Sequence, residues 1–357
     1  MCEVKHPNVS VVVPTYNERD NIEELITRID RALSSAKIPY EVVVVDDNSP
    51  DGTAEVASRL STRYPVKVIK RPGKLGLSSA VIEGVRNSAA DAIAVMDADL
   101  QHPPELIPRL YQRLAQGGCD IVVASRYVRG GEVRGWSVFR RLVSRAATML
   151  ARVLVPQARK VNDPLSGYFM FKKDAIGRLN HINPRGFKIL LEILAKGRYR
   201  RVCEEPYSFG LRVRGSSKLS SKVMWDFVVQ TLNLSPDYLK FAIVGASGTL
   251  VNLGVVALCR YVLGLLHEVA SALGIEVSVI NNFVLNDLWT FRSRRMGPWP
   301  LRLAKFHLST LASILVQYAT SIVAFHYVIH ESVISQFLGI VAGFIVNYTV
   351  SRRFVWR

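Results

Sequence analysis

The chain has 357 residues, 49% of them hydrophobic, and a formal net charge of +17, and this length suits two domains better than one. The positive charge favours anionic partners, such as a membrane surface or phosphorylated substrates, and the absence of any recognisable nucleic-acid module argues against DNA or RNA. The four cysteines are far apart and form no CxxC pair, which makes zinc and redox motifs improbable and predicts reduced thiols rather than a disulfide framework.

The first 235 residues alternate short apolar runs with amphipathic stretches. The expected strands are 9–14, 41–46, 66–70, 92–96 and 120–124, and the expected helices include 19–35, 77–88 and 104–116. Continuous Val/Ile runs with helices between them predict an α/β domain with a mainly parallel sheet covered on both faces. Functional residues in such a sheet lie at the carboxyl ends of the strands.

The strand expected at 92–96 is followed by Asp97, Ala98, Asp99, Leu100 and Gln101. Two carboxylates separated by one residue can converge on a divalent cation, and the amide oxygen of Gln101 could complete the set. Such a pair can also simply cap the next helix, but its place at the end of an apolar strand favours a Mg²⁺ or Mn²⁺ site.

The first two strands end in polar residues as well. No glycine-rich turn follows the first strand, which argues against a dinucleotide-binding enzyme. Asp46 and Asp47 end the second strand, where a carboxylate either accepts hydrogen bonds from a base or ribose or belongs to a capped turn. The stretch 71–76 lacks the spacing of a phosphate-binding loop.

The stretch 138–155 is amphipathic. On a helical wheel Arg141, Arg145 and Arg152 share one face, and an apolar set shares another, namely Leu142, Ala146, Met149, Leu150 and Val153. This pattern is typical of a helix lying in a membrane interface, although an ordinary surface helix has it too. A weaker candidate for the same role is the stretch 222–234.

Residues 236–357 contain four segments about long enough to span a bilayer, namely 241–259, 269–291, 306–329 and 332–351. Lys and Arg flank the first segment on its amino side, fill the connection between the second and third, and follow the fourth. The positive-inside rule therefore predicts an integral membrane protein of four spans, with the catalytic part and both termini in the cytoplasm.

Eight motifs in the catalytic part occur in a specific order: PTYNE at 14–18, VVVDDNSPDGT at 43–53, GLSSAV at 76–81, MDADLQHPP at 96–104, SRYVRGG at 125–131, DPLSGYF at 163–169, GFKILLEIL at 186–194 and FGLRVRGSSKL at 209–219. The set resembles the family-2 glycosyltransferases of GT-A fold, in particular the dolichol-phosphate mannose synthases and related polyprenyl-phosphate glycosyltransferases. Two tail motifs, at 241–252 and 281–291, resemble the four-helix GtrA-like membrane domain. The resemblance therefore implies a GT-A domain at 1–235, Rossmann-like with flanking helices, and an all-α four-helix transmembrane domain at 236–357.

The resemblance also implies roles for individual residues. The nucleoside of the donor would be held by Pro14, Tyr16, Glu18, Val45 and Asp47. The metal and donor diphosphate would be bound at Asp97, Ala98, Asp99 and Gln101, with Lys188, Arg212 and Lys218 around the diphosphate or on a loop that closes over it. The acceptor lipid phosphate would be received by Arg126 and Arg140, with Asp163 near that end of the site.

The implied reaction is an inverting, metal-dependent transfer of mannose from GDP-mannose to dolichyl or polyprenyl phosphate. One alternative keeps the reaction but uses UDP-glucose as the donor. Another makes the C-terminal half a flippase for a lipid-linked sugar, because polar residues lie inside the spans, namely Glu276, Asn281, Asn282, Asp287 and Asn347. We favour hydrogen bonds between helices as the role of these five residues.

Overall fold

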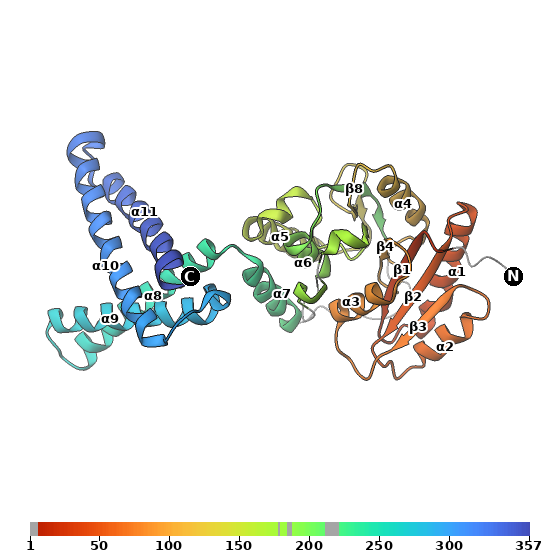
Figure 1. Ribbon diagram of the computed structural model, residues 1–357, viewed down its shortest axis with the longest axis horizontal. Helices are drawn as coiled ribbons and strands as arrows, with labels where there is room; N and C mark the ends of the chain where they lie inside the picture. The colour runs from red at the N-terminus through yellow and green to blue at the C-terminus, as the bar shows by residue number, and fades with distance from the viewer. Residues whose placement is uncertain (1–5, 178, 184–187, 211–220) are drawn as a thin grey trace. The chain divides into compact units, whose positions relative to one another are not determined.

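The computed structural model describes residues 6–177, 179–183, 188–210 and 221–357, and divides the chain into two compact units, Met1–Leu234 and Ser235–Arg357. In the first unit the strands lie between helices (Figure 1). The sheet has seven strands in the order β3-β2-β1-β4-β7-β5-β8. Their bounds are β1 Val9–Thr15, β2 Tyr40–Asp46, β3 Val66–Lys70, β4 Ala92–Val95, β5 Ile121–Ser125, β7 Phe169–Lys172 and β8 Val202–Pro206.

The two faces of the sheet bury different side chains of the same strands. In β1, Val11 and Val13 pack with Ile22 and Leu25 of helix α1 (Arg19–Ser35), whereas Val12 packs in a second core. That second core includes residues of α3 (Leu77–Asn87) and α6 (Ile189–Lys196) on the opposite face. The alternation of a strand explains why every residue of β1 is buried and why the run reads as continuously apolar.

The mainly parallel sheet with flanking helices confirms the predicted α/β architecture, with one departure. Strand β7 runs antiparallel to both of its neighbours, β4 and β5, and neither it nor β8 was predicted as a strand. A four-residue strand carries too little periodicity to distinguish it from a loop.

The expectation of reduced thiols is wrong for two of the four cysteines. Cys119 and Cys203 form a disulfide across a sequence separation of 84 residues. Cys119 lies just before β5, and Cys203 lies in β8, which pairs with β5 in parallel. Strand order determines this proximity, and cysteine spacing along the chain does not reveal it. Cys259 is free and buried.

The remaining elements of the first unit connect or cover the sheet. A small parallel pair joins β6 (Glu132–Val133) to β9 (Ser208–Phe209). The other helices are α2 Thr53–Leu60, α4 Ile107–Ala115, α5 Val138–Leu154 and α7 Ser221–Leu234, with short 3-10 turns at η1 Pro104–Leu106, η2 Pro156–Lys160, η3 Lys173–Ile176 and η4 Leu179–His181. The predicted amphipathic stretches 138–155 and 222–234 are thus the helices α5 and α7.

The second unit is all-helical. Its elements are α8 Asp237–Ala257, η5 Leu258–Val262, α9 His267–Leu285, η6 Asn286–Thr290, η7 Arg292–Arg294, α10 Trp299–Ala324, η8 Phe325–Ile329, α11 Ser332–Val350 and η9 Ser351–Val355. Within the described residues three helical stretches are long and apolar enough to cross a membrane, namely Asp237–Val262, Val269–Thr290 and Trp299–Ile329. The fourth expected segment coincides with α11, and its crossing of a membrane stays a prediction.

The polar residues of the predicted spans bond from one helix to another. Asp287 accepts hydrogen bonds from Arg302 Nε and from Trp356 Nε1, both at 2.9 Å. Asn347 Oδ1 accepts from Ser309 Oγ at 3.0 Å, and Glu276 bonds His307 at 3.1 Å. These contacts agree with the favoured interpretation, in which polar residues hold helices together.

Candidate active site

The loops after β1 and β2 are fastened to each other by the buried carboxylate of Asp46. It accepts hydrogen bonds from Thr15 Oγ1 at 2.9 Å and from the backbone N–H of Ser49 at 2.8 Å. Ser49 Oγ in turn accepts the backbone N–H of Asn17 at 3.0 Å, and Thr53 Oγ1 accepts that of Glu18 at 3.0 Å. The two predicted nucleoside-binding segments therefore form one rigid edge.

Asp47 pairs with Arg71, a residue that the sequence did not single out. Its Oδ1 accepts from Arg71 Nη1 at 2.5 Å, and its Oδ2 accepts the backbone N–H of Gly76 at 2.8 Å. Both partners of the ion pair are buried. Asp47 thus holds the 71–76 loop against the end of β2, beside Tyr16, whose ring faces Lys74 Nζ at 3.9 Å from its centroid.

The metal motif lies directly after β4. The side chain of Asp97 is 40% exposed, whereas Asp99 and Gln101 are buried. Asp99 Oδ1 accepts the backbone N–H of Gln101 at 3.2 Å, and Gln101 Nε2 donates to the Gly210 carbonyl at 3.0 Å. Of the two amide atoms of Gln101, only the oxygen could therefore bind a metal. Two carboxylates and an amide oxygen are hard ligands that fit Mg²⁺ or Mn²⁺, and a donor diphosphate would have to supply the rest.

No cluster of three or more His, Cys, Asp or Glu side chains suited to a metal occurs among the described residues. Asp97, Asp99 and the Gln101 amide oxygen would supply at most part of an octahedral coordination sphere, and a phosphorylated substrate would have to complete it.

His102 contacts Asp97 and is a site residue that the sequence did not single out. Its Nε2 is 3.3 Å from Asp97 Oδ2, and its Nδ1 is 3.1 Å from the Tyr207 hydroxyl. Gly167 approaches the same carboxylate so closely that an added Cβ would lie 3.0 Å from Asp97 Oδ2. The adjacent His in MDADLQHPP was the available signal, but its partner Tyr207 is 105 residues away.

The predicted acceptor-side residues Arg126 and Asp163 form a buried, two-pronged ion pair. Arg126 Nε donates to Asp163 Oδ2 at 2.7 Å, and Nη2 donates to Oδ1 at 2.8 Å. Burial disfavours the charge on Arg126, but the hydrogen bonds and the attraction of Asp163 outweigh it and raise the pKa of Arg126. The guanidinium is therefore charged at every relevant pH.

Lys188 lies within electrostatic reach of this pair and of Asp97. Its Nζ donates to the Leu165 carbonyl at 3.1 Å. Desolvation and repulsion by Arg126 lower the pKa of Lys188, while the charges of Asp97 and Asp163 oppose that shift. Glu192, one turn further along the chain, pairs with Lys196 at 2.7 Å.

Arg140, in the first turn of α5, lies over the Trp136 ring at 4.4 Å, and Arg126 lies 5.5 Å from the same ring centroid. The buried Trp136 Nε1 has no hydrogen-bond partner among the described residues. Trp136 was not predicted, yet it brings the two expected acceptor arginines to a single aromatic surface.

The remaining predicted residues divide into two groups. Pro14 and Val45 are buried near the ends of β1 and β2, and Ala98 is buried in the segment after β4. At these positions the backbone rather than the side chain could face a ligand. Arg212 and Lys218 lie outside the described residues, and their expected role stays a prediction.

Two family models match the chain, one to each unit. The model for glycosyl transferase family 2 matches residues 10–179, and that for the GtrA/DPMS transmembrane domain matches residues 240–356. The dolichol-phosphate mannosyltransferase of Pyrococcus furiosus is 45% identical over 98% of this chain and 99% of its own length. That of Saccharomyces cerevisiae is 40% identical over 63% of this chain and 86% of its own.

Among solved structures, glucosyl-3-phosphoglycerate synthase from Mycobacterium tuberculosis in complex with Mn²⁺, UDP and glucosyl-3-phosphoglycerate matches with a TM-score of 0.47 and 20% identity. The match covers 64% of this chain and 78% of that one.

Proposed function

The chain belongs to the dolichol-phosphate mannosyltransferases, and from that premise we propose that it transfers mannose from GDP-mannose to dolichyl or polyprenyl phosphate. The anomeric configuration inverts, so an α-linked donor yields dolichyl phosphate β-mannose. The single observation that carries this assignment is the convergence of the metal motif, the Arg126–Asp163 pair and Lys188 in one site.

The acceptor phosphate needs little activation. A phosphate monoester has its second pKa near 6 and is therefore largely dianionic at neutral pH. In-line attack of its oxygen on the anomeric carbon forms the new bond as the bond to the nucleoside diphosphate breaks. The demand on the protein is to orient the acceptor oxygen and to neutralise charge on the leaving diphosphate.

The residues at the site divide these tasks. Arg126 and Arg140 bind and orient the acceptor phosphate, and Asp163 fixes the position of the Arg126 guanidinium. Lys188 supplies positive charge between that phosphate and Asp97. Asp97, Asp99 and Gln101 hold a divalent cation, which when bound neutralises developing charge on the diphosphate.

The nucleoside binds at the rigid edge formed by the ends of β1 and β2. Pro14, Tyr16, Glu18, Val45 and Asp47 line it, and Arg212 and Lys218 act on the diphosphate side. Arg71 already donates a hydrogen bond to one carboxylate oxygen of Asp47. Asp47 can therefore accept hydrogen bonds from the nucleoside only through the lone pairs that remain.

We also propose the arrangement at the membrane. Residues 1–235 form the catalytic domain in the cytoplasm, and 236–357 form four spans with both termini on the same side. Exposed apolar side chains on α5, among them Phe139 and Met149, and Trp225 on α7 support contact of these helices with the bilayer surface.

A donor screen tests the function. Detergent-solubilised full-length protein is supplied with a divalent cation, polyprenyl phosphate and either GDP-mannose or UDP-glucose, and the lipid-linked sugar is measured. Transfer from GDP-mannose alone supports the proposal, and transfer from UDP-glucose alone refutes the donor assignment. Absence of transfer in detergent, together with movement of a lipid-linked sugar in sealed vesicles, would point to a flippase.

A further inference from the structure

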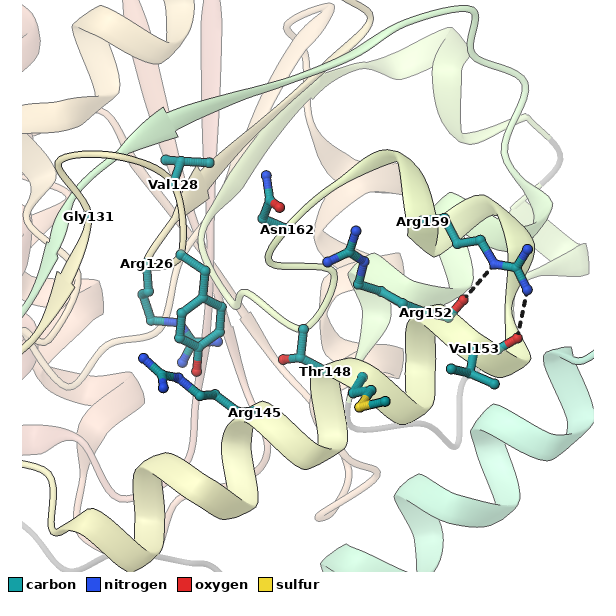
Figure 2. A pocket seen from close by; sticks show the side chains of 11 residues that line it. Arg126, Val128, Gly131, Arg145, Thr148, Arg152, Val153, Arg159 and Asn162 are labelled. Atoms are coloured by element: carbon teal, nitrogen blue, oxygen red, sulfur yellow. Dashed lines mark hydrogen bonds between the residues drawn. The ribbon is translucent and has the colours of Figure 1, made fainter.

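A basic pocket of about 760 Å³ lies beside α5 (Figure 2), and none of its lining residues belongs to the metal motif. Helix α5 contributes Arg145, Thr148 and Arg152 to one wall. Tyr127 and Asn162, from the segments after β5 and η2, also line it. In Figure 2 the Arg152 side chain reaches toward Asn162, while Arg145 extends on the Arg126 side.

The charge in this pocket is unbalanced. Four arginines and no acidic residue line it. Arg126 is committed to Asp163, and Arg159 donates to the carbonyls of Arg152 and Val153 at the end of α5. Within the described part of the chain, Arg145 and Arg152 have no carboxylate partner. Two guanidinium groups therefore remain available to an anion.

The polar groups between the arginines point to the same kind of ligand. Thr148 is 7% exposed, and its buried hydroxyl has no hydrogen-bond partner among the described residues. The Tyr127 hydroxyl bonds Ser144 Oγ of α5 at 2.8 Å, which fixes the neighbouring wall. An unsatisfied buried hydroxyl is costly, and an anion held by the adjacent arginines would satisfy it.

An apolar row lies next to the two arginines on the same helix. Val138, Leu142, Met149 and Val153 are all at least half exposed and follow one another at helical spacing. Arg145 and Arg152 are seven residues apart and flank this row. If the row enters a bilayer, the two guanidinium groups come to the level of the lipid phosphates.

We propose that this pocket binds the phosphate headgroup of an anionic bilayer phospholipid, separately from the acceptor phosphate. Arg140, the acceptor residue on α5, does not line the pocket, whereas Arg126 does and is the one residue that the two sites would share. The excess positive charge selects an anionic headgroup over a zwitterionic one. The inference rests on the proposed contact of α5 with the membrane and is independent of which sugar is transferred.

The test uses full-length protein in non-ionic detergent, with bound phospholipid counted by native mass spectrometry during titration with phosphatidylglycerol. The pocket variant is Arg145→Gln/Arg152→Gln. The matched control is Arg129→Gln/Arg141→Gln, which removes the same charge outside the pocket, from the loop before β6 and from α5. Thermal unfolding and GDP affinity check that both variants are folded, and Arg145→Gln alone replaces the double variant if that one is not.

The wild type is expected to retain one phosphatidylglycerol that polyprenyl phosphate does not displace. The pocket variant should bind it at least about tenfold more weakly, and the control less than threefold more weakly. Equal weakening in both variants overturns the proposal in favour of diffuse charge attraction. One-for-one displacement by polyprenyl phosphate overturns it in favour of an acceptor path, and equal retention of phosphatidylcholine overturns the anionic selectivity.

Discussion

Arg126 donates hydrogen bonds to both carboxylate oxygens of Asp163, at 2.7 and 2.8 Å, with neither side chain more than 8% exposed. Arg126 directly follows β5, and the Trp136 ring lies near the guanidinium groups of both Arg126 and Arg140. An arginine held in this way has a fixed direction before any phosphate arrives, which reduces the entropy lost on binding.

Asp163→Asn should lower the free energy of unfolding by about 3 kcal/mol, because it leaves a buried guanidinium without its counter-charge. Use of the acceptor should fall more than affinity for GDP, since Arg126 loses its orientation. Chemical unfolding in detergent and separate acceptor and donor titrations measure the two effects. The control is Glu105→Gln, which removes the similar but solvent-exposed pair with Arg28 and should cost less than about 1 kcal/mol. Equal losses of unfolding free energy in the two variants would contradict a larger stabilisation by the buried pair than by the exposed one.

Asp99→Asn should abolish transfer, and chelation by EDTA should do so reversibly. A metal ion at a departing diphosphate contributes several kcal/mol, which corresponds to a loss of more than about 100-fold. Transfer is measured with and without EDTA and after adding back Mg²⁺ or Mn²⁺. Asp91→Asn, just before the amino end of β4, is the control and should leave the rate within about twofold. Full activity in EDTA would refute the metal assignment.

His102→Gln should lower the enzyme's apparent affinity for the divalent cation and leave the maximal rate of transfer unchanged. His102 bonds Asp97 and Tyr207, so its loss frees the carboxylate to rotate. Residues that orient a metal ligand typically contribute about 10- to 100-fold to metal affinity. The rate is measured against Mn²⁺ concentration, with the exposed His181→Gln as control. A lower maximal rate at unchanged half-saturating Mn²⁺ would refute a positioning role.

Much of the site followed from sequence because parallel strands place their carboxyl ends together. The polar residues after β1, β2 and β4 could be assigned to one edge without coordinates. The amphipathic pattern likewise predicted α5 with bounds close to Val138–Leu154. These features depend on local spacing, which a sequence displays directly.

The partners of those residues could not be predicted, because they come from distant parts of the chain. Arg71 reaches Asp47 from 24 residues away, and Tyr207 reaches His102 from 105. The disulfide was missed for the same reason, since only the pairing of β5 with β8 brings its cysteines together. Such contacts follow from strand order, and the antiparallel β7 in the middle of the sheet gave no periodic signal.

We expect the loss of the Lys188 charge to make activity fall at a lower alkaline pH than loss of an exposed lysine's charge would. Because desolvation and Arg126 lower the pKa of Lys188 from the usual 10.5, its charge is lost at a lower pH than for an exposed lysine. Lys188→Arg should keep its charge and shift the alkaline limb upward. The pH dependence of kcat/KM for the donor measures this, and Lys173→Arg, which bonds the Ser88 carbonyl outside the site, is the control. An unchanged alkaline limb in Lys188→Arg would exclude Lys188 as its source.

Arg140→Ala should reduce acceptor use far more than donor binding. A charge-assisted contact to a phosphate contributes about 2 to 3 kcal/mol, so kcat/KM for polyprenyl phosphate should fall about 30- to 150-fold. Arg140 is held over Trp136, and its removal leaves the Arg126–Asp163 pair intact, so GDP affinity should change less than threefold. The measurement is acceptor saturation at fixed donor beside GDP binding by calorimetry. Arg141→Ala, the next residue on α5, removes the same charge where the side chain is exposed, and it should leave the acceptor's kcat/KM within about threefold. Equal losses of acceptor use in the two variants would mean that α5 acts through its overall charge, whereas equal losses of donor and acceptor binding in Arg140→Ala would place this arginine outside the acceptor site.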